Sequence, residues 1–378
     1  MPSVMRPLTP RRTRLLRLRG QQLLPSHAAP TVGAAARSVV GLQAQSWPAA
    51  VLAVRPRTCN LTALNVERAR VEGRTVVRSW FMRGTLHLVA TEDVGWLLGL
   101  LAPGAIASAQ RRRLDLGLDD ATYTSAVRVL EAALADGPKS RAEIEDELVD
   151  RGVPIEPKTQ ALIHLIQRAA LEGRVCYGPQ RGREQEIVLL RDWVDVAPAL
   201  DPDTALGELA RRYLAAFAPA APADFAKWSG LPMPLSRRAF AALAGELAEV
   251  SVWDAPAWIT RESLGALDEF ELERAEPTVR LLGAFDTYLI GYADRRSFAD
   301  ERYWNRIWYG GLISPVVIVD GEVTATWKPE RKARETIVRI SPFEPLDPAL
   351  TPALEAEAAD IGRFLGMETR LVIEKPAG

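Results

Sequence analysis

The stretch ATYTSAVRVLEAALADGPKSRAEIEDELVDRGVPIEPKTQALIHLIQRAALEGRVCYGPQRGREQEIVLL, residues 121–190, decides the fold class. Its first part, 122–134, has helical periodicity. Ser140 followed by Glu143 is typical of a capping box that begins a second helix. A third helical segment, 158–173, precedes two short apolar runs around a polar turn. Three helices followed by a two-stranded hairpin form the winged-helix plan, a variant of helix-turn-helix.

The same order of elements returns, more weakly, over residues 204–260. Residues 262–276 are acidic and end in proline, so we expect them to be a connector. The chain is β-rich beyond this point, and Asp320-Gly321 between two apolar runs predicts a tight hairpin. The sequence therefore predicts an α+β protein with tandem winged-helix units and a C-terminal β-rich, barrel-like domain.

These patterns predict four consecutive domains. They are an N-terminal winged-helix-like unit (1–118), a second winged helix (119–200), a third winged helix (201–262) and the β-rich domain (263–378). Within the first we expect helices over 8–24, with Thr9 as N-cap and Pro10 in the first turn, over 31–42 and over 61–71, extended runs over 75–81 and 84–90, and a further helix from Thr91.

The composition indicates a cytoplasmic protein without metal. No run of 18 apolar residues could span a membrane, and arginines interrupt the N-terminal leucines, which argues against a secretory signal. The cysteines and histidines stand far apart, without zinc-ligand spacing, so we expect a reducing compartment, no metal and no cofactor. They are Cys59, Cys176, His27, His87 and His164.

Charge is distributed unevenly along the chain. The net charge is −1, yet residues 1–118 hold 17 arginines, no lysine and five acids, a net of +12, and the remainder carries −13. Such asymmetry suggests a surface that faces a polyanion. A high-GC genome would explain the preference for arginine over lysine, but not the absence of any acid before Glu67.

The segment GLQAQSWP, residues 41–48, is the main candidate for chemistry, because no GxSxG, Walker, GxGxxG or HExxH motif occurs. Gly41 and Pro48 bracket it and predict a non-helical backbone. In an extended chain Gln43 and Gln45 would project to the same side, where two amides can hold one water. The alternative is that they are ordinary surface residues in a turn.

Several segments of the chain resemble a known protein family. GLQAQ (41–45), MRGTLHLV (82–89), FAKWSGL (225–231), LLGAFDTYLIGYADR (281–295) and SPVVIVDGEVTATW (314–327) occur in the order found in a winged-helix DNA-binding family. That family contains the bacterial AlkZ-like and YcaQ-like DNA glycosylases, and the chain resembles it over most of its length.

The Gln-x-Gln form resembles the AlkZ-like branch, whereas the YcaQ-like branch has Gln-x-Asp, from which Gln45 departs. The resemblance implies that Gln43 and Gln45 are catalytic residues. It also implies a substrate of double-stranded DNA carrying bulky N-alkylated purines, including interstrand crosslinks, and self-resistance to a DNA-alkylating antibiotic.

Other side chains are candidates for DNA contact. Arg83 and His87 would share one face of a strand, with Arg83 on a phosphate, although His87 fits a half-buried strand residue equally well. Trp47 either stacks on a base or, as we favour, packs under the turn. Two arginine pairs have the character of hairpin or wing tips, or of solvated loops: Arg181 with Arg183, and Arg295 with Arg296. We expect Asp286 to be a structural hydrogen-bond acceptor.

Two other functions fit a winged-helix chain. One is a transcriptional regulator, and the other is an architectural or drug-sequestering protein that binds DNA without cutting it. No heptad pattern marks a dimerisation helix, so we expect a monomer. Both alternatives would tolerate Gln43→Ala and Gln45→Ala, and a glycosylase would not.

Overall fold

The computed structural model describes residues 6–265, 276–332 and 335–376. The chain forms two compact units. We call residues 67–205 the central unit, and Met1–Val66 with Leu206–Gly378 the discontinuous unit. Of the expected N-terminal domain, 1–118, residues 1–66 belong to the discontinuous unit and residues 67–118 to the central unit, and the four expected domains stay a prediction.

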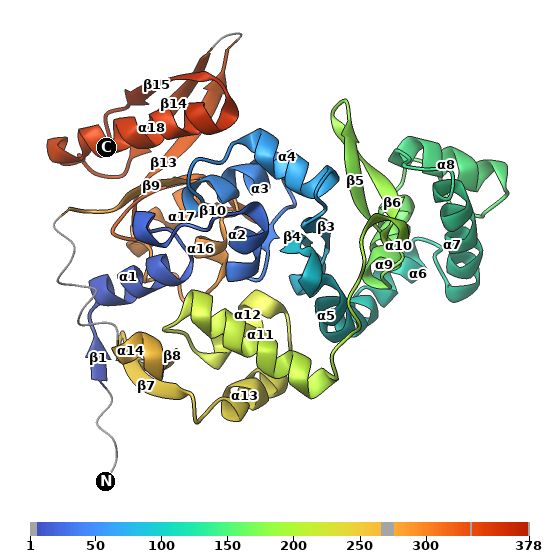
Figure 1. The fold of residues 1–378 in the computed structure, drawn as a ribbon, viewed down its shortest axis with the longest axis horizontal. Helices are drawn as coiled ribbons and strands as arrows, with labels where there is room; N and C mark the ends of the chain where they lie inside the picture. The colour runs from blue at the N-terminus through green and yellow to red at the C-terminus, as the bar shows by residue number, and fades with distance from the viewer. Residues whose placement is uncertain (1–5, 266–275, 333–334, 377–378) are drawn as a thin grey trace. The chain divides into compact units, whose positions relative to one another are not determined.

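The central unit contains the three helices and the hairpin expected from the sequence (Figure 1). Ser140 caps the second helix, and its backbone N–H donates to Glu143 Oε2 at 2.7 Å, which completes the capping box. Leu130, Leu165 and Ile187 are fully buried where the helices meet the hairpin. The elements are α7 (Asp120–Leu134), α8 (Arg141–Asp150), α9 (Ala161–Leu171), β5 (Val175–Arg181) and β6 (Glu184–Leu189).

The rest of the central unit extends this hairpin into a larger sheet. β3 (Val76–Trp80) pairs antiparallel with β4 (Leu86–Ala90), and β3 also meets β5 through Arg78 and Tyr177. Both expected strands, at 75–81 and 84–90, are confirmed, and each is shorter than expected by two residues. Three further helices belong to this unit. Two follow β4 in the chain, α5 (Val94–Ser108) and α6 (Gln110–Asp115), and one follows β6, α10 (Leu190–Trp193).

The second set of three helices and a hairpin belongs largely to the discontinuous unit. An aromatic cluster holds it together: the rings of Tyr213 and Phe217 stack at 4.9 Å, and Trp228 lies 5.0 Å from Tyr213. The elements are α11 (Pro202–Phe217), α12 (Pro222–Ser229), α13 (Met233–Ala242), β7 (Leu247–Val252) and β8 (Ala255–Thr260). β1 (Arg6–Leu8) pairs with β7 in parallel, which joins the two chain segments of this discontinuous unit.

The C-terminal part is a five-stranded sheet in the order β15-β14-β13-β12-β9. Its apolar core includes Leu281, Val338 and Ile361, the last on α18 (Thr351–Leu365), which packs along the sheet (Figure 1). Asp320 and Gly321 form the expected tight turn, with positive φ angles of 47° and 83°. The strands are β9 (Val279–Leu282), β12 (Val316–Val319), β13 (Glu322–Arg331), β14 (Glu335–Pro342) and β15 (Glu368–Ile373). The chain is thus α+β, as expected.

The N-terminal segment of the discontinuous unit carries the Gln-x-Gln motif. Thr9 caps α1 (Pro10–Gly20), as expected. The next helix, α2 (Val32–Ser38), is shorter than the predicted 31–42 because Val40 and Gly41 have positive φ angles and turn the chain out of the helix. β2 (Leu42–Gln43) and α3 (Trp47–Val54) follow, and α4 (Ala63–Val71) crosses the boundary between the units.

The expected connector, 262–276, begins in α14 (Arg261–Gly265), and residues 266–275 lie outside the described residues. Among the helices that the structure describes, none is long and apolar enough to cross a membrane.

Candidate active site and DNA-contact residues

The Gln-x-Gln motif forms a turn between β2 and α3. Gln43 ends β2, and its side-chain Oε1 accepts a hydrogen bond from the Gln45 backbone N–H at 3.2 Å. The backbone from Gly41 to Ser46 is non-helical, as expected. Pro48 lies in the first turn of α3, a helix that the sequence analysis did not predict. The turn is therefore closed by the side chain of its own first glutamine.

The two glutamines differ in exposure. Gln43 is only 7% exposed, whereas Gln45 is exposed. Gln43 folds back onto the turn through this hydrogen bond to the Gln45 N–H, and that the two amides together hold one water stays a prediction. The Nε2 group of Gln43 has no acceptor in the described part of the chain, and it keeps contact with solvent. One amide group oriented by the backbone thus retains two free donors.

Two buried arginines anchor the helix that follows the motif. Arg55, just after α3, forms ion pairs of 2.8 Å with both Glu357 and Asp360 on α18, and it donates to the Leu281 carbonyl. Burial alone would lower the pKa of Arg55, but the two carboxylates raise it above its usual range. Its charge is therefore locked against α18, within the same unit as the motif.

Arg57 makes the second anchor. Its guanidinium donates to both oxygens of Asp286, at 2.6 and 2.8 Å, and to Thr287 Oγ1. Asp286 is buried and also caps α16 (Thr287–Ile290), so its expected role as a structural acceptor is confirmed. The sequence did not single out the two arginines, although basic residues directly after an apolar helix were a usable signal.

Arg83 and His87 do not share a strand face, which corrects the sequence prediction. Arg83 lies in the 3-10 turn Met82–Gly84 between β3 and β4, with φ at +57°, and only His87 is in β4. His87 is buried, and its Nδ1 lies 2.9 Å from the Thr85 carbonyl. Burial and then the Arg83 charge lower the pKa of His87 to about 3, so its imidazole is neutral at physiological pH. Burial also lowers the pKa of Arg83 to about 10, which leaves it protonated.

Arg181 ends β5 and Arg183 lies in the β5–β6 turn, so both stand at the tip of the hairpin. Arg181 pairs with Glu143 at the start of α8 and with Glu186 at 2.9 Å. The Arg181 hydrogen bond lowers the pKa of Glu143 to about 2. Arg183 is exposed in the turn and has no ion pair among the described residues. Of the two, Arg183 is the cation more available to a phosphate.

Arg295 and Arg296 lie exposed in a loop after α16, which is the solvated-loop alternative and not the hairpin tip. Arg296 forms an ion pair with Asp294 at 2.6 Å. The guanidinium of Arg295 lies over the Trp308 ring, 4.6 Å from its centroid. Trp308 begins a small hairpin, β10 (Trp308–Tyr309) and β11 (Leu312–Ile313), so Arg295 packs at the base of that hairpin.

The β10–β11 hairpin is a surface that the sequence reasoning missed. Tyr309 is 73% exposed and Leu312 is 58% exposed, on either side of a turn made by Gly310 and Gly311. Large apolar side chains at an exposed tip favour contact with a partner. A Gly-Gly pair between two apolar dipeptides was the sequence signal that would have found it.

Trp47 begins α3 and is half-buried, so its role on a base or under the turn stays a prediction. Among the described residues, no group of three or more His, Cys, Asp or Glu side chains could hold a metal ion.

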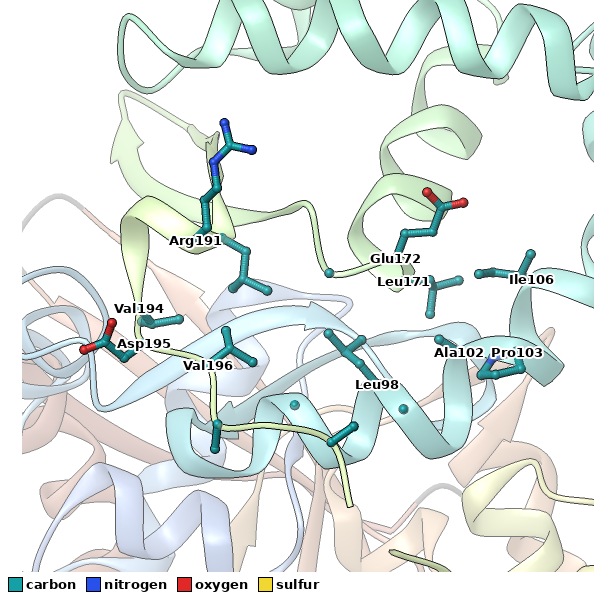
Figure 2. Close-up of a pocket in the computed structure, with 16 residues that line it drawn as sticks. Leu98, Ala102, Pro103, Ile106, Leu171, Glu172, Arg191, Val194, Asp195 and Val196 are labelled. Atoms are coloured by element: carbon teal, nitrogen blue, oxygen red, sulfur yellow. The ribbon is translucent and has the colours of Figure 1, made fainter. Parts of the chain in front are cut away.

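A cavity of about 630 Å³ in the central unit contains none of the candidate residues. Figure 2 shows Leu98, Ala102 and Pro103 of α5 facing it, together with Leu171 from the end of α9. Its carboxylate Glu172 accepts from the Tyr123 hydroxyl at 2.7 Å and pairs with Arg168 and Arg174. Arg191 and Asp195 also line the cavity, whose other lining residues are mostly apolar, and no residue of the Gln-x-Gln turn reaches it.

Comparison with known proteins assigns the family. The model of the family described as "DNA glycosylase AlkZ-like" matches residues 36–364, which include the Gln-x-Gln turn and both arginine anchors. The chain belongs to the AlkZ-like DNA glycosylase family. It is 29% identical over 363 residues to the interstrand DNA cross-link repair glycosylase of Streptomyces sahachiroi, covering 92% of this chain and 94% of that protein.

A solved structure agrees with the AlkZ-like assignment. The Streptomyces sahachiroi DNA glycosylase AlkZ matches with a TM-score of 0.75 and 26% identity, covering 97% of this chain and all of that one. The expected enzyme class, DNA glycosylase, is therefore confirmed for this AlkZ-like chain, and the regulator and architectural alternatives are not favoured.

Proposed function

We propose that the chain is a monofunctional DNA glycosylase that hydrolyses the N-glycosidic bond of purines alkylated at N7 or N3, with Gln43 and Gln45 as its catalytic residues. The observation that carries the proposal is the turn in which Gln43 Oε1 accepts from the Gln45 backbone N–H, while the Gln43 Nε2 donors have no acceptor among the described residues. Family membership supports the reaction class.

The chemistry suits amides, because an alkylated purine is already cationic. Its C1′–N9 bond breaks with the electron pair passing to the purine, which becomes neutral, so no general acid is needed. A water forms the new bond to C1′ and gives its proton to solvent. The two amides have enough donors and acceptors to hold this water, and positioning of that kind contributes several kcal/mol.

The substrate that we propose includes interstrand crosslinks. The relative from Streptomyces sahachiroi is named for interstrand crosslink repair. A base tied to both strands cannot be flipped easily into a deep pocket, and Gln45 is exposed in a surface turn. We further propose a role in repair or in self-resistance to a DNA-alkylating antibiotic, as a cytoplasmic, nucleoid-associated monomer.

The DNA contacts that we propose come from both units. In the central unit we propose phosphate contacts by Arg181 and Arg183 at the β5–β6 hairpin and by Arg83 in the β3–β4 turn. His87 is buried in β4, so we do not propose it as a direct contact. In the discontinuous unit, Arg295 and Arg296 flank the β10–β11 hairpin, whose Tyr309 and Leu312 suit insertion into a groove.

Single-turnover release of N7-methylguanine from a defined duplex tests the proposal. The wild type should release the base, and the Gln43→Ala/Gln45→Ala variant should not, while both bind the duplex equally. Release by the double variant at the wild-type rate would overturn the site assignment. Binding without release from any alkylated or crosslinked duplex would favour a DNA-binding regulator instead.

A further inference from the structure

A groove of about 820 Å³ lies in the discontinuous unit, lined by residues of α13, β7 and β8 and by Arg6 of β1. β1, β7 and β8 form one sheet, and α13 directly precedes β7 in the chain (Figure 1). The groove contains none of the candidate site residues described above. Its volume falls in the range of pockets for drug-sized ligands, which is enough for a nucleotide or two but not for a duplex.

Three arginines from separate elements line this groove: Arg6 of β1, Arg237 of α13 and Arg261 after β8. Arg261 Nε donates to the Gly245 carbonyl at 3.2 Å, which fixes the side chain. This bond leaves the two terminal nitrogens of the guanidinium as donors for a ligand. Within the described ranges, neither Arg237 nor Arg261 forms an ion pair. Glu249 is the one acid among the lining residues, so the lining carries a net charge of +2. Planar guanidinium groups in this number suit phosphate.

The same groove has an aromatic wall. Trp258 is half-buried and lies edge-to-face with the buried Phe240, with ring centroids 6.0 Å apart and planes at 89°. The backbone of Trp258 is also fixed, because its N–H donates to the Ala220 carbonyl and its carbonyl accepts from the Ala220 N–H. An aromatic side chain fixed beside cations is the arrangement that stacks bases of a single strand while its phosphates are neutralised.

We propose that this groove binds an unpaired segment of DNA, with a base against Trp258 and adjacent phosphates on Arg237 and Arg261. The proposal rests on the proposed function only in taking DNA as the polymer. A strand end or an unpaired stretch near the lesion would then be held at a place separate from the Gln-x-Gln turn.

Fluorescence anisotropy with a labelled eight-residue oligothymidine tests the groove in the full chain. Arg237→Gln/Arg261→Gln should weaken binding about tenfold and reduce the slope of log Kd against log salt by about 1.4, as expected for two lost phosphate contacts. Arg238→Gln removes a charge from the next position of α13, which does not line the groove, and is the matched control. Equal affinity and equal salt slope for the double variant and the control would overturn the proposal.

Further variants separate base stacking from charge. Trp258→Leu should weaken oligothymidine binding about fivefold or more, and Trp258→Phe should restore most of it. Glu249→Gln should tighten binding, because it removes the one acid of the lining. The proposal would be overturned if polyglutamate displaced the oligonucleotide and Trp258→Leu had no effect. The groove would then bind any polyanion through charge alone. Thymidine monophosphate binding as tightly as the oligomer would overturn it in favour of a free nucleotide.

The proposed glycosylase activity can fail separately. The binding assay uses undamaged DNA, so it does not depend on catalysis. On a short blunt duplex with saturating enzyme, the groove variants should release N7-methylguanine at the wild-type rate. The wild type and every variant could fail to release the base while Arg237→Gln/Arg261→Gln still loses oligothymidine binding. That result would support the groove as a DNA-binding site and contradict the proposed glycosylase activity.

Discussion

Arg57 and Asp286 form a two-pronged ion pair, with N–O distances of 2.6 and 2.8 Å, in which both side chains are fully buried. The pair joins the segment directly after α3 to the cap of α16, across 229 positions of the sequence. Buried pairs of this kind do not guarantee stability, but each partner depends strongly on the other. Because α3 begins at Trp47, just after the motif, the pair also helps to set where the Gln-x-Gln turn stands.

Replacing Asp286 with alanine should lower the free energy of unfolding by about 3–5 kcal/mol, because the Arg57 charge would be left buried without a partner. Urea denaturation measures this loss. The matched control is Glu246→Gln, which removes the exposed partner of Arg211 at 3.0 Å and should cost less than about 1 kcal/mol. A loss for Asp286→Ala as small as the control's would show that the pair does not hold the segment.

Gln45→Ala should lower the single-turnover rate of base release about a hundredfold, the usual scale for losing one positioned polar group near the reacting atoms. Because Gln45 is exposed, its free energy of unfolding should change by less than about 0.5 kcal/mol. Gln43→Ala should lose the rate and also about 1 kcal/mol of stability, since Gln43 Oε1 holds the turn. Wild-type rates in both variants would contradict the proposed mechanism.

The stability of the chain should fall as the pH is lowered from 7.5 to 5. The pKa of His87 is about 3 when folded and about 6.5 when unfolded, so between these values the unfolded chain binds one more proton. The stability is complete above about pH 6.5 and is lost as the pH falls toward 3, by about 2 kcal/mol between pH 7.5 and 5 for this side chain. Comparing wild type with His87→Gln isolates it, because burial also lowers the pKa of His27 and His164. Identical pH slopes in the two proteins would show that His87 titrates normally.

Tyr309→Ser/Leu312→Ser should weaken binding to an undamaged duplex about tenfold, if the β10–β11 tip inserts its apolar side chains between base steps. Both side chains are exposed, so the melting temperature should not change. Leu114→Ser, at an equally exposed leucine of α6, is the control for loss of apolar surface. Duplex affinity equal to that of the control would remove the hairpin from the DNA interface.

Local chemistry explains which predictions from sequence are confirmed. Ser140 with Glu143, Thr9 before α1 and the Asp320-Gly321 turn all act on backbone groups within three residues, so their effects are visible in the sequence. The order of three helices and a hairpin follows from such signals and from helical periodicity. The failures lie where one residue overrides a pattern: the positive φ at Arg83 places it in a turn outside the strand that holds His87.

The motif shows the same division. Gly41 and Pro48 predicted a non-helical turn, because glycine and the residue before proline disfavour continuing a helix. They could not predict that Gln43 would be buried and Gln45 exposed, which depends on how the side chain of Gln43 folds back on its own turn and on what packs around β2.

The sequence by itself determined the elements, their order, the chemical character of the Gln-x-Gln turn and, through resemblance, the family. Only the tertiary structure decided that β1 pairs with β7, that Arg55 and Arg57 find Glu357 and Asp286, and that Arg6, Arg237 and Arg261 line one groove. Periodicity and capping are set by neighbours along the chain, whereas these partners lie on separate elements, most of them more than 200 positions apart, and meet only because burial of apolar surface brings their elements together.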